Sequence, residues 1–188
     1  KGETIANVGI GIVGTMSEEG KRAKDYLDKF IKSKPEFFAN ASMIEVNSGG
    51  IPVSVSSKTF VGDGIVVVGD AAQQVNPIHG GGIGLAMNAA KIAADVIANA
   101  IDEDNVSAKR LVEYEKIWQD TDGNKLKRLM KLRHFIETMD DESFEKLADM
   151  LSGDDILKLV VDTDLKLLLK VFIRKAPSML TLAKKYLE

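Results

Sequence analysis

The sequence has no cysteine, only two histidines and no long apolar run. Without cysteine the chain forms no disulfide, thiolate metal site or catalytic thiol, and it suits a reducing compartment, so we expect a cytoplasmic protein. The histidines, His79 and His134, are too far apart in sequence for a metal-ligand spacing, so we expect no metal. No apolar run reaches the roughly 18 residues that span a bilayer.

The composition is that of an ordinary globular chain. Hydrophobic residues make up 45% of the 188 residues and charged residues 28%, which places the chain outside the disordered and fibrous classes. The formal net charge of -3 gives no global field that favours nucleic acid, so we expect no such partner. The chain begins at Lys1 without methionine and enters the strand-like run Ile5–Val13 almost at once, which predicts a fragment of a longer protein.

The first part of the chain is predicted to contain strands and one helix. β-branched and glycine-rich runs predict strands over Ile5–Val13, Met43–Val46 and Ile51–Val55, and apolar spacing predicts a helix over Glu18–Ser33. The continuous apolar run Ile65–Val68 predicts a strand that is buried on both faces.

The rest of the chain is predicted to be helical. Gly84–Ile101 has helical spacing with many alanines, and the acidic stretch Asp102–Asn105 ends it. The composition changes near residue 103, which makes this the best internal boundary. Six further helices are predicted, over Ser107–Thr121, Asn124–Thr138, Asp141–Leu151, Asp154–Val161, Asp162–Lys175 and Pro177–Leu187.

The candidate cofactor site is the segment Gly69–Asn88. The apolar strand delivers Asp70 at its carboxyl end, where open α/β sheets bind ligands, and a carboxylate there accepts hydrogen bonds from a polyol. Three consecutive glycines, Gly80, Gly81 and Gly82, then let backbone N–H groups face a ligand, and the following helix directs about half a positive charge at the same place. Such donors favour the anionic edge of a reduced flavin.

Two other phosphate-binding patterns fit the sequence less well. A P-loop requires Gly-Lys-Ser/Thr after the glycines, and none follows Gly82. Residues Gly9–Gly14 match the spacing G-x-G-x-x-G, but the helix begins only after Ser17, too late to receive a pyrophosphate. No strand ending in an acidic residue follows about 20 positions on, so we reject a dinucleotide fingerprint there.

Three lesser features leave alternatives open. His79 lies beside the glycines, where it either supports the turn or faces a ligand. The basic helix that contains His134 is solvated by default, although its positive face suits acidic lipid headgroups. The amphipathic, basic stretch Leu165–Lys175 either packs on its own domain or lies on a membrane surface.

The central segment resembles the second flavin motif of the p-hydroxybenzoate-hydroxylase-like flavoproteins. It is most similar to the geranylgeranyl reductase family, in particular its archaeal digeranylgeranylglycerophospholipid reductase branch, in Gly69–Ala72 and Pro77–Met87. Gly9 and Gly11 match the end of that family's substrate-side motif, whose Phe-Pro part is absent here. The specific motifs occupy only residues 1–11 and about 61–90, although the helical tail also resembles the family.

The resemblance implies an α/β fold, or α+β for this part alone: a partial FAD-binding fold followed by a C-terminal helical region. It implies three regions. Residues 1–60 would be part of a substrate-binding sheet region, and residues 61–103 would be the C-terminal portion of the FAD-binding domain. Residues 104–188 would form a helical C-terminal domain. The N-terminal Rossmann strand with its true G-x-G-x-x-G is missing. We therefore expect the chain alone to be inactive and to bind FAD weakly or not at all. We also expect its exposed sheet edges and apolar faces to drive oligomerisation unless another chain supplies the missing half.

The resemblance also implies an activity and a site. Members of the family use reduced FAD to hydrogenate geranylgeranyl chains of archaeal membrane ether lipids, with a hydride going to one alkene carbon and a proton to the other. Asp70 would hold the ribityl or phosphate region, and Gly9 and Gly11 would leave space for the prenyl chain. The flavin ring and pyrophosphate side would be lined by Gly80, Gly81, Gly82, Ile83 and Gly84. No residue is assigned as proton donor.

The sequence leaves the reaction partners open. The electron donor is a reduced nicotinamide or a ferredoxin-like protein, and the lipid substrate places the protein in peripheral contact with the membrane's inner face. One alternative function is a flavin-dependent aromatic monooxygenase, which shares the Gly69-Asp70 motif. Another is a non-catalytic helical module that binds a lipid or a partner protein.

Overall fold

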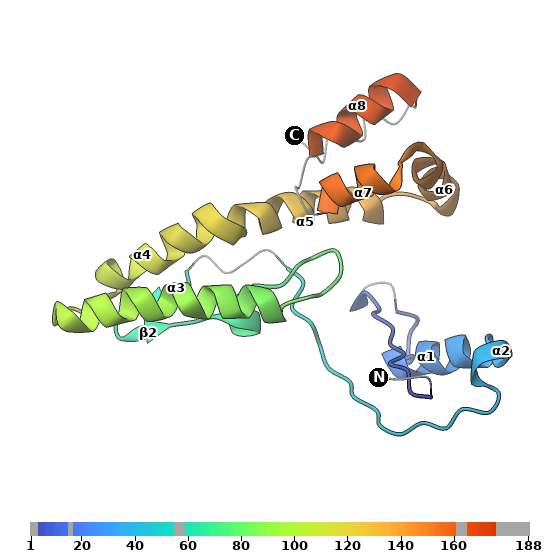
Figure 1. Ribbon diagram of the computed structural model, residues 1–188, viewed down its shortest axis with the longest axis horizontal. Coiled ribbons are helices and arrows are strands. Elements are labelled where there is room, and N and C mark those ends of the chain that lie inside the picture. The colour runs from blue at the N-terminus through green and yellow to red at the C-terminus, as the bar shows by residue number, and fades with distance from the viewer. Residues whose placement is uncertain (1–3, 15–16, 55–58, 161–164, 176–188) are drawn as a thin grey trace. The chain divides into compact units, whose positions relative to one another are not determined.

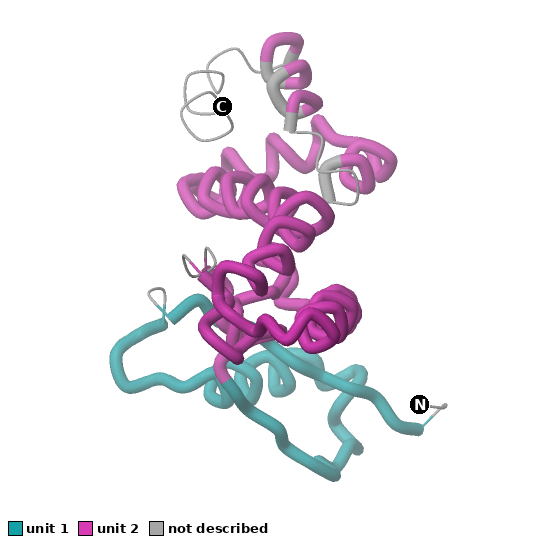
Figure 2. The backbone as a smooth tube through the Cα atoms, turned by 90° about the vertical axis from the view of Figure 1, so that its left-hand side faces the viewer, with its two compact units in different colours: residues 1–49 teal, residues 50–188 magenta. Residues whose placement is uncertain are grey.

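The computed structural model describes residues 4–14, 17–54, 59–160 and 165–175 (Figure 1). The chain forms two compact units, residues 1–49 and residues 50–188 (Figure 2). Its described secondary structure is mostly helical, with one small sheet.

Unit 1 contains two helices among its described residues, α1 (Ala23–Lys32) and α2 (Pro35–Phe38). Helix α1 confirms the second half of the helix predicted over residues 18–33. The strands predicted over Ile5–Val13 and Met43–Val46 are wrong, because these residues have no regular structure. A strand forms only against a hydrogen-bonded neighbour, and no described residue pairs with either segment.

Unit 2 begins with an irregular segment and a hairpin. Strands β1 (Val61–Gly62) and β2 (Ile65–Val66) are antiparallel, and Gly64 at their turn has a φ of 70°, which glycine adopts without strain. The strand predicted over Ile65–Val68 is confirmed only for β2, and its burial on both faces is wrong because Ile65 is 60% exposed. Residues 51–54 of the other predicted strand form none.

Helices α3 (Ile83–Asp102) and α4 (Ala108–Trp118) form the centre of unit 2 and run side by side in opposite directions (Figure 1). Helix α3 confirms the helix predicted over Gly84–Ile101. Its buried side carries small residues such as Ala89 and Ala93, which allow close approach of α4. Ser107 caps α4, since its hydroxyl oxygen accepts a hydrogen bond from the Arg110 N–H.

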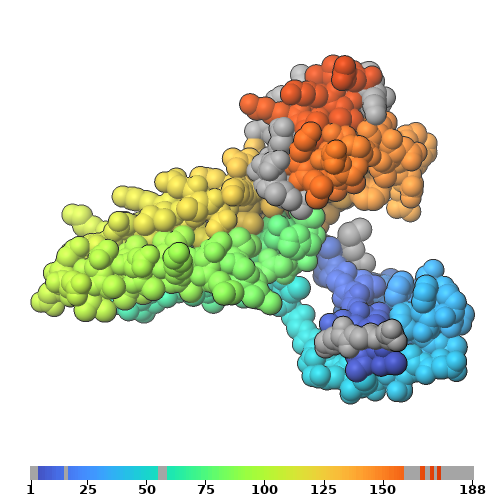
Figure 3. Space-filling view, in the orientation of Figure 1, coloured from blue at the N-terminus to red at the C-terminus, as the bar shows by residue number. Residues whose placement is uncertain are grey.

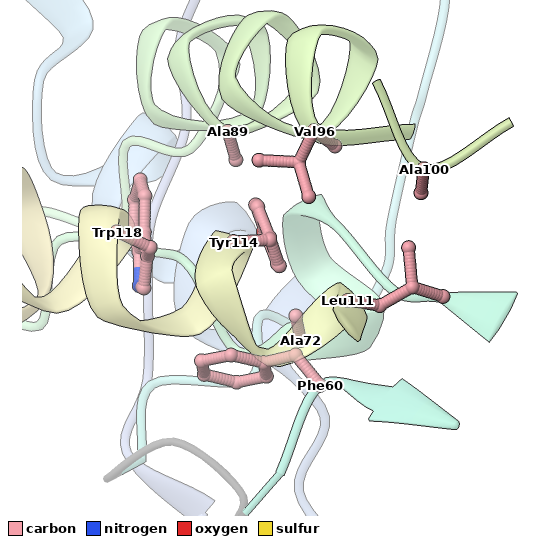
Figure 4. Close-up of a cluster of buried hydrophobic side chains, with 9 residues drawn as sticks. Phe60, Ala72, Ala89, Val96, Ala100, Leu111, Tyr114 and Trp118 are labelled. Carbon is pink, nitrogen blue, oxygen red and sulfur yellow. The ribbon is translucent and has the colours of Figure 1, made fainter. Parts of the chain in front are cut away.

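The core of unit 2 lies between α3, α4 and the hairpin. Figure 4 shows Tyr114 and Trp118 of α4 in one cluster with small residues of α3, and the Phe60 ring packs against Tyr114 with 6.4 Å between the ring centroids. Tyr114 and Trp118 are 0% and 1% exposed. Both side chains are therefore part of the core.

A π-helical turn, η3 (Gln119–Gly123), joins α4 to α5 (Asn124–Glu137) without a break (Figure 1). The sequence predicted helices on both sides of this point, which is confirmed. Helices α6 (Asp141–Met150), α7 (Gly153–Val160) and α8 (Leu165–Lys175) follow, as predicted within a few residues. The predicted helix over residues 177–187 lies outside the described residues.

Candidate functional site

Asp70 lies on a short 3-10 turn, η2 (Gly69–Ala72), directly after the hairpin. Gly69 has a φ of 68°, and its N–H donates to the Gln74 Oε1 at 2.7 Å, while the Gln74 N–H donates to the Gly69 carbonyl at 3.0 Å. These bonds fix the turn and leave the Asp70 side chain exposed. No hydrogen bond to its carboxylate is present among the described residues, so both oxygens are available as acceptors.

A series of buried hydrogen bonds connects this turn to α4. The Gln74 side chain is 0% exposed, and its Nε2 donates to the Tyr114 hydroxyl at 2.6 Å. The Tyr114 hydroxyl in turn donates to the Val67 carbonyl at 3.4 Å. Burial raises the pKa of the Tyr114 phenol, so this group stays protonated and remains a donor at neutral pH. Because all three polar groups are partnered, the network holds Asp70 in place.

The loop between η2 and α3 is closed by its own backbone. The Asn76 N–H donates to the Gly81 carbonyl and the Gly80 N–H to the Asn76 carbonyl, both at 2.9 Å. Arg133 of α5 donates from its Nη1 to the Pro77 carbonyl at 3.0 Å. The Arg133 side chain is only 14% exposed, so the default of a solvated basic helix is wrong at this position.

Each of the three glycines of the loop is required by the fold for a different reason. Gly80 has a φ of 72°, which disfavours any side chain. A methyl group at Gly81 would lie 2.6 Å from the His79 ring, whose Nδ1 accepts from the Gly81 N–H at 3.1 Å. A methyl group at Gly82 would lie 3.0 Å from the Asp70 Oδ1, so the fold brings Asp70 against the glycines. His79 thus supports the turn and also faces the cavity described below.

The first turn of α3 presents free backbone donors. Gly82 is the N-cap and offers no side-chain cap, and the first N–H that bonds back within the helix is that of Ala86, to the Gly82 carbonyl. The N–H groups of Ile83, Gly84 and Leu85 have no partner among the described residues. At Gly84 an added methyl group would meet nothing within 4 Å, so the fold itself does not require glycine there.

A cavity of about 580 Å³ opens at this helix start. That volume is in the range of small-molecule sites. The loop and α3 form one wall, and η3 and α5 form the other. The first wall contains Asn76, His79, Gly80, Gly81, Gly82, Ile83, Gly84 and Leu85, and the second contains Asp122, Lys125, Leu126 and Leu129.

The predicted substrate residues Gly9 and Gly11 lie in unit 1. Both are exposed, and a methyl group at either would meet nothing within 4 Å. Their predicted role beside a prenyl chain therefore stays a prediction, as do the roles of Asp70 and the glycine loop.

The part of the chain that the structure describes contains neither a metal site nor a membrane-spanning helix. No group of three or more histidine, aspartate or glutamate side chains is placed to hold a metal ion there, and the chain has no cysteine. None of the described helices combines the length and apolar character needed to cross a membrane.

The sequence did not reveal the cavity wall formed by η3 and α5, or the buried Gln74 side chain that connects the Asp70 turn to α4. Asp122 and Lys125 follow Asp70 and the glycines at long sequence separation, and their spacing carries no motif. Gln74 reads as an ordinary loop residue, and only its full burial reveals its role. The sequence predicts the basic helix as a whole, but no signal in it distinguishes Lys125 from its exposed neighbours.

Comparison with protein families gives one match, in the N-terminal part of the chain. Residues 1–51 match the geranylgeranyl reductase catalytic domain. The match includes Gly9 and Gly11 and ends before Asp70.

Comparison with curated proteins gives relatives over nearly the whole chain. The digeranylgeranylglycerophospholipid reductase of Methanothrix thermoacetophila is 38% identical over 181 residues, which are 96% of this chain and 44% of that protein. Digeranylgeranylglycerophospholipid reductase 2 of Methanopyrus kandleri is 40% identical over 187 residues, 98% of this chain and 47% of that protein. The chain thus spans a little under half the length of these relatives.

A solved structure has a similar fold. A geranylgeranyl bacteriochlorophyll reductase-like protein from Thermoplasma acidophilum matches with a TM-score of 0.72 and 28% identity. The match covers 87% of this chain and 40% of the other, the same partial coverage as in the sequence comparisons.

Proposed function

Since this chain belongs to the geranylgeranyl reductase family, we propose that it forms part of an FAD-dependent reductase that hydrogenates geranylgeranyl chains of archaeal ether lipids. The relatives' names support the reaction and the lipid class. The observation that carries the flavin site is the cavity at the start of α3, which is lined by residues with free N–H groups, while the unpaired Asp70 carboxylate lies against Gly82 of its wall.

The residues present fit an FAD. The free N–H groups from Ile83 to Leu85 and the positive end of α3 suit an anionic group, because a helix start attracts negative charge. The Asp70 carboxylate suits the ribityl hydroxyls, since it accepts hydrogen bonds. The glycine loop suits close passage of the cofactor, and Gly84 has open space beside it. A bound, reduced flavin supplies the hydride that one alkene carbon receives.

The chain by itself leaves an apolar face of α3 uncovered. Ile83, Met87 and Ile101 are 83%, 68% and 61% exposed on the side opposite the core, and α3 forms surface along its length in Figure 3. Apolar helix faces of this kind are normally covered. We propose that the remaining length of the protein, which the relatives have, covers it and supplies the other half of the flavin site.

The proposed substrate is a prenylated glycerolipid, which also determines the proposed location of the protein. Gly9 and Gly11 lie inside the segment matched to the catalytic domain and have no atom within 4 Å of an added methyl group, which supports a role beside a prenyl chain. A prenylated glycerolipid substrate places the protein at the inner face of the membrane as a peripheral, cytoplasmic enzyme.

The activity is tested in a chimera in which this chain replaces the matching part of the Methanopyrus kandleri relative. With chemically reduced FAD and a geranylgeranyl ether lipid under anaerobic conditions, we expect the lipid to gain two hydrogen atoms at each reduced double bond, as measured by mass spectrometry. The control is the unaltered relative. A chimera that binds FAD but leaves the lipid unchanged, or that only consumes oxygen and yields an oxygenated aromatic product, would contradict the reductase function.

A further inference from the structure

The helical region supplies a complete wall of the cofactor cavity. The residues of this wall come from the end of η3 and the first turns of α5, and two of them are charged: Asp122 and Lys125. Neither residue forms an ion pair in the part of the chain that the structure describes. The charges at the cavity are therefore available to whatever occupies it.

The π-helical turn places these side chains. A π turn contains one residue more than an α turn, so it rotates the helix that follows, and such turns are frequent at functional sites. Gly123 permits it: the residue is buried, and a methyl group there would lie 2.7 Å from the Gln119 Oε1. Because Asp122 and Lys125 are three residues apart on a helical path, they share one side, the side of the cavity.

Lys125 and the start of α3 favour the same sign of charge from opposite walls of the cavity. The start of α3 presents free N–H groups and the positive end of the helix dipole, and Lys125 adds a full positive charge from the opposite wall. Asp122 opposes them both, so its charge lowers the attraction of the cavity for an anion. A cationic ligand would be repelled by Lys125 and by the positive end of the helix dipole.

On the basis of the proposed function, we propose that Lys125 is a cofactor-binding residue that holds an anionic group of FAD against the start of α3, and that Asp122 tunes the charge of this site. The anionic group is either the pyrophosphate, which is charged in both redox states, or the flavin ring, which gains negative charge on two-electron reduction. Both are the same chemistry, an anion shared between a lysine and a helix start.

The test measures FAD dissociation constants and the flavin midpoint potential in the chimera. We expect Lys125→Gln to weaken binding of at least one redox form roughly tenfold, the loss of one charge-assisted hydrogen bond at a partly open site. Asp122→Asn should change the same quantity in the opposite direction, and Lys125→Arg should retain most of the affinity. The matched control is Lys116→Gln, because Lys116 is an exposed lysine of α4 outside the cavity.

The pattern of the effects identifies the anionic group. If Lys125 holds the pyrophosphate, both redox forms weaken equally, the potential stays constant and riboflavin binding is unaffected. If it holds the ring, the reduced form weakens more and the potential falls, by about 30 mV for a tenfold ratio of the two affinities. Either outcome supports the inference.

A Lys125→Gln variant that equals Lys116→Gln in both affinities and in potential would overturn the inference while leaving the proposed function intact. An unsubstituted chimera that binds no FAD would instead remove the proposed function, and this inference with it. Melting temperatures of the apo variants separate binding effects from folding, and we expect them to be unchanged because Lys125 is exposed.

Discussion

Replacing Asp70 with alanine should lower the affinity of the chimera for FAD by one to two orders of magnitude, because the proposed hydrogen bonds from the ribityl hydroxyls to its carboxylate would be charge-assisted. The apo fold keeps its stability within about 0.5 kcal/mol, since Asp70 is exposed and no hydrogen bond to its carboxylate is present among the described residues. Flavin fluorescence titration gives the affinity, and thermal unfolding of the apo protein gives the stability.

Asp95→Ala is the matched control for this prediction. Asp95 is an exposed carboxylate on α3, more than three helical turns beyond the helix start, so its removal changes net charge equally and should leave FAD affinity unchanged. Asp70→Asn keeps an oxygen acceptor but loses the charge, and it should fall between the wild type and Asp70→Ala. Equal flavin content in Asp70→Ala and Asp95→Ala would show that Asp70 does not hold the flavin and would favour a non-catalytic helical module that binds a lipid or a partner protein.

Replacing Trp118 with alanine destabilises unit 2 by about 4 kcal/mol, the usual cost of deleting a large buried aromatic side chain. Trp118 is 1% exposed and packs in the core between α3 and α4 (Figure 4). The surrounding small residues of α3 cannot fill the space that the indole leaves. Denaturant unfolding followed by the helical circular dichroism signal measures the change.

The control for Trp118 comes from the same helix. Lys116→Ala removes an exposed side chain two positions away, and its effect should stay within about 0.5 kcal/mol. If Trp118→Ala also cost less than 1 kcal/mol, Trp118 would belong to a surface that another chain covers, and the core described for unit 2 would be wrong.

The helices could be predicted from the sequence, and most strands could not. Helix α3 is specified locally, by alanine-rich apolar spacing that starts just after three glycines. The run Ile5–Val13 looks equally regular, but a strand depends on a partner from elsewhere, and no described residue supplies one. The same dependence explains why only Ile65–Val66 of the predicted central strand is formed.

The candidate site was predictable on one wall only. Asp70 and the glycine loop lie close together in sequence and carry recognisable turn and helix-start chemistry. Lys125 reaches the cavity only because α3 and α4 pack in opposite directions and a π turn then rotates α5. Neither the helix packing nor the π turn has a local sequence motif. A cavity wall that depends on long-range packing therefore cannot be predicted from motifs.

The flavin site at the start of α3 is tested most directly by the FAD dissociation constant of Gly84→Ala in the chimera. A methyl group at Gly84 meets no protein atom within 4 Å, and alanine favours a helix over glycine by up to about 1 kcal/mol, so the apo fold should be at least as stable. We predict that FAD affinity nevertheless falls roughly tenfold or more, because the methyl group occupies space that the cofactor needs. Gly153→Ala, at the start of α7 with equally open surroundings, should leave the affinity unchanged. An unchanged affinity in Gly84→Ala would contradict a flavin at this helix start.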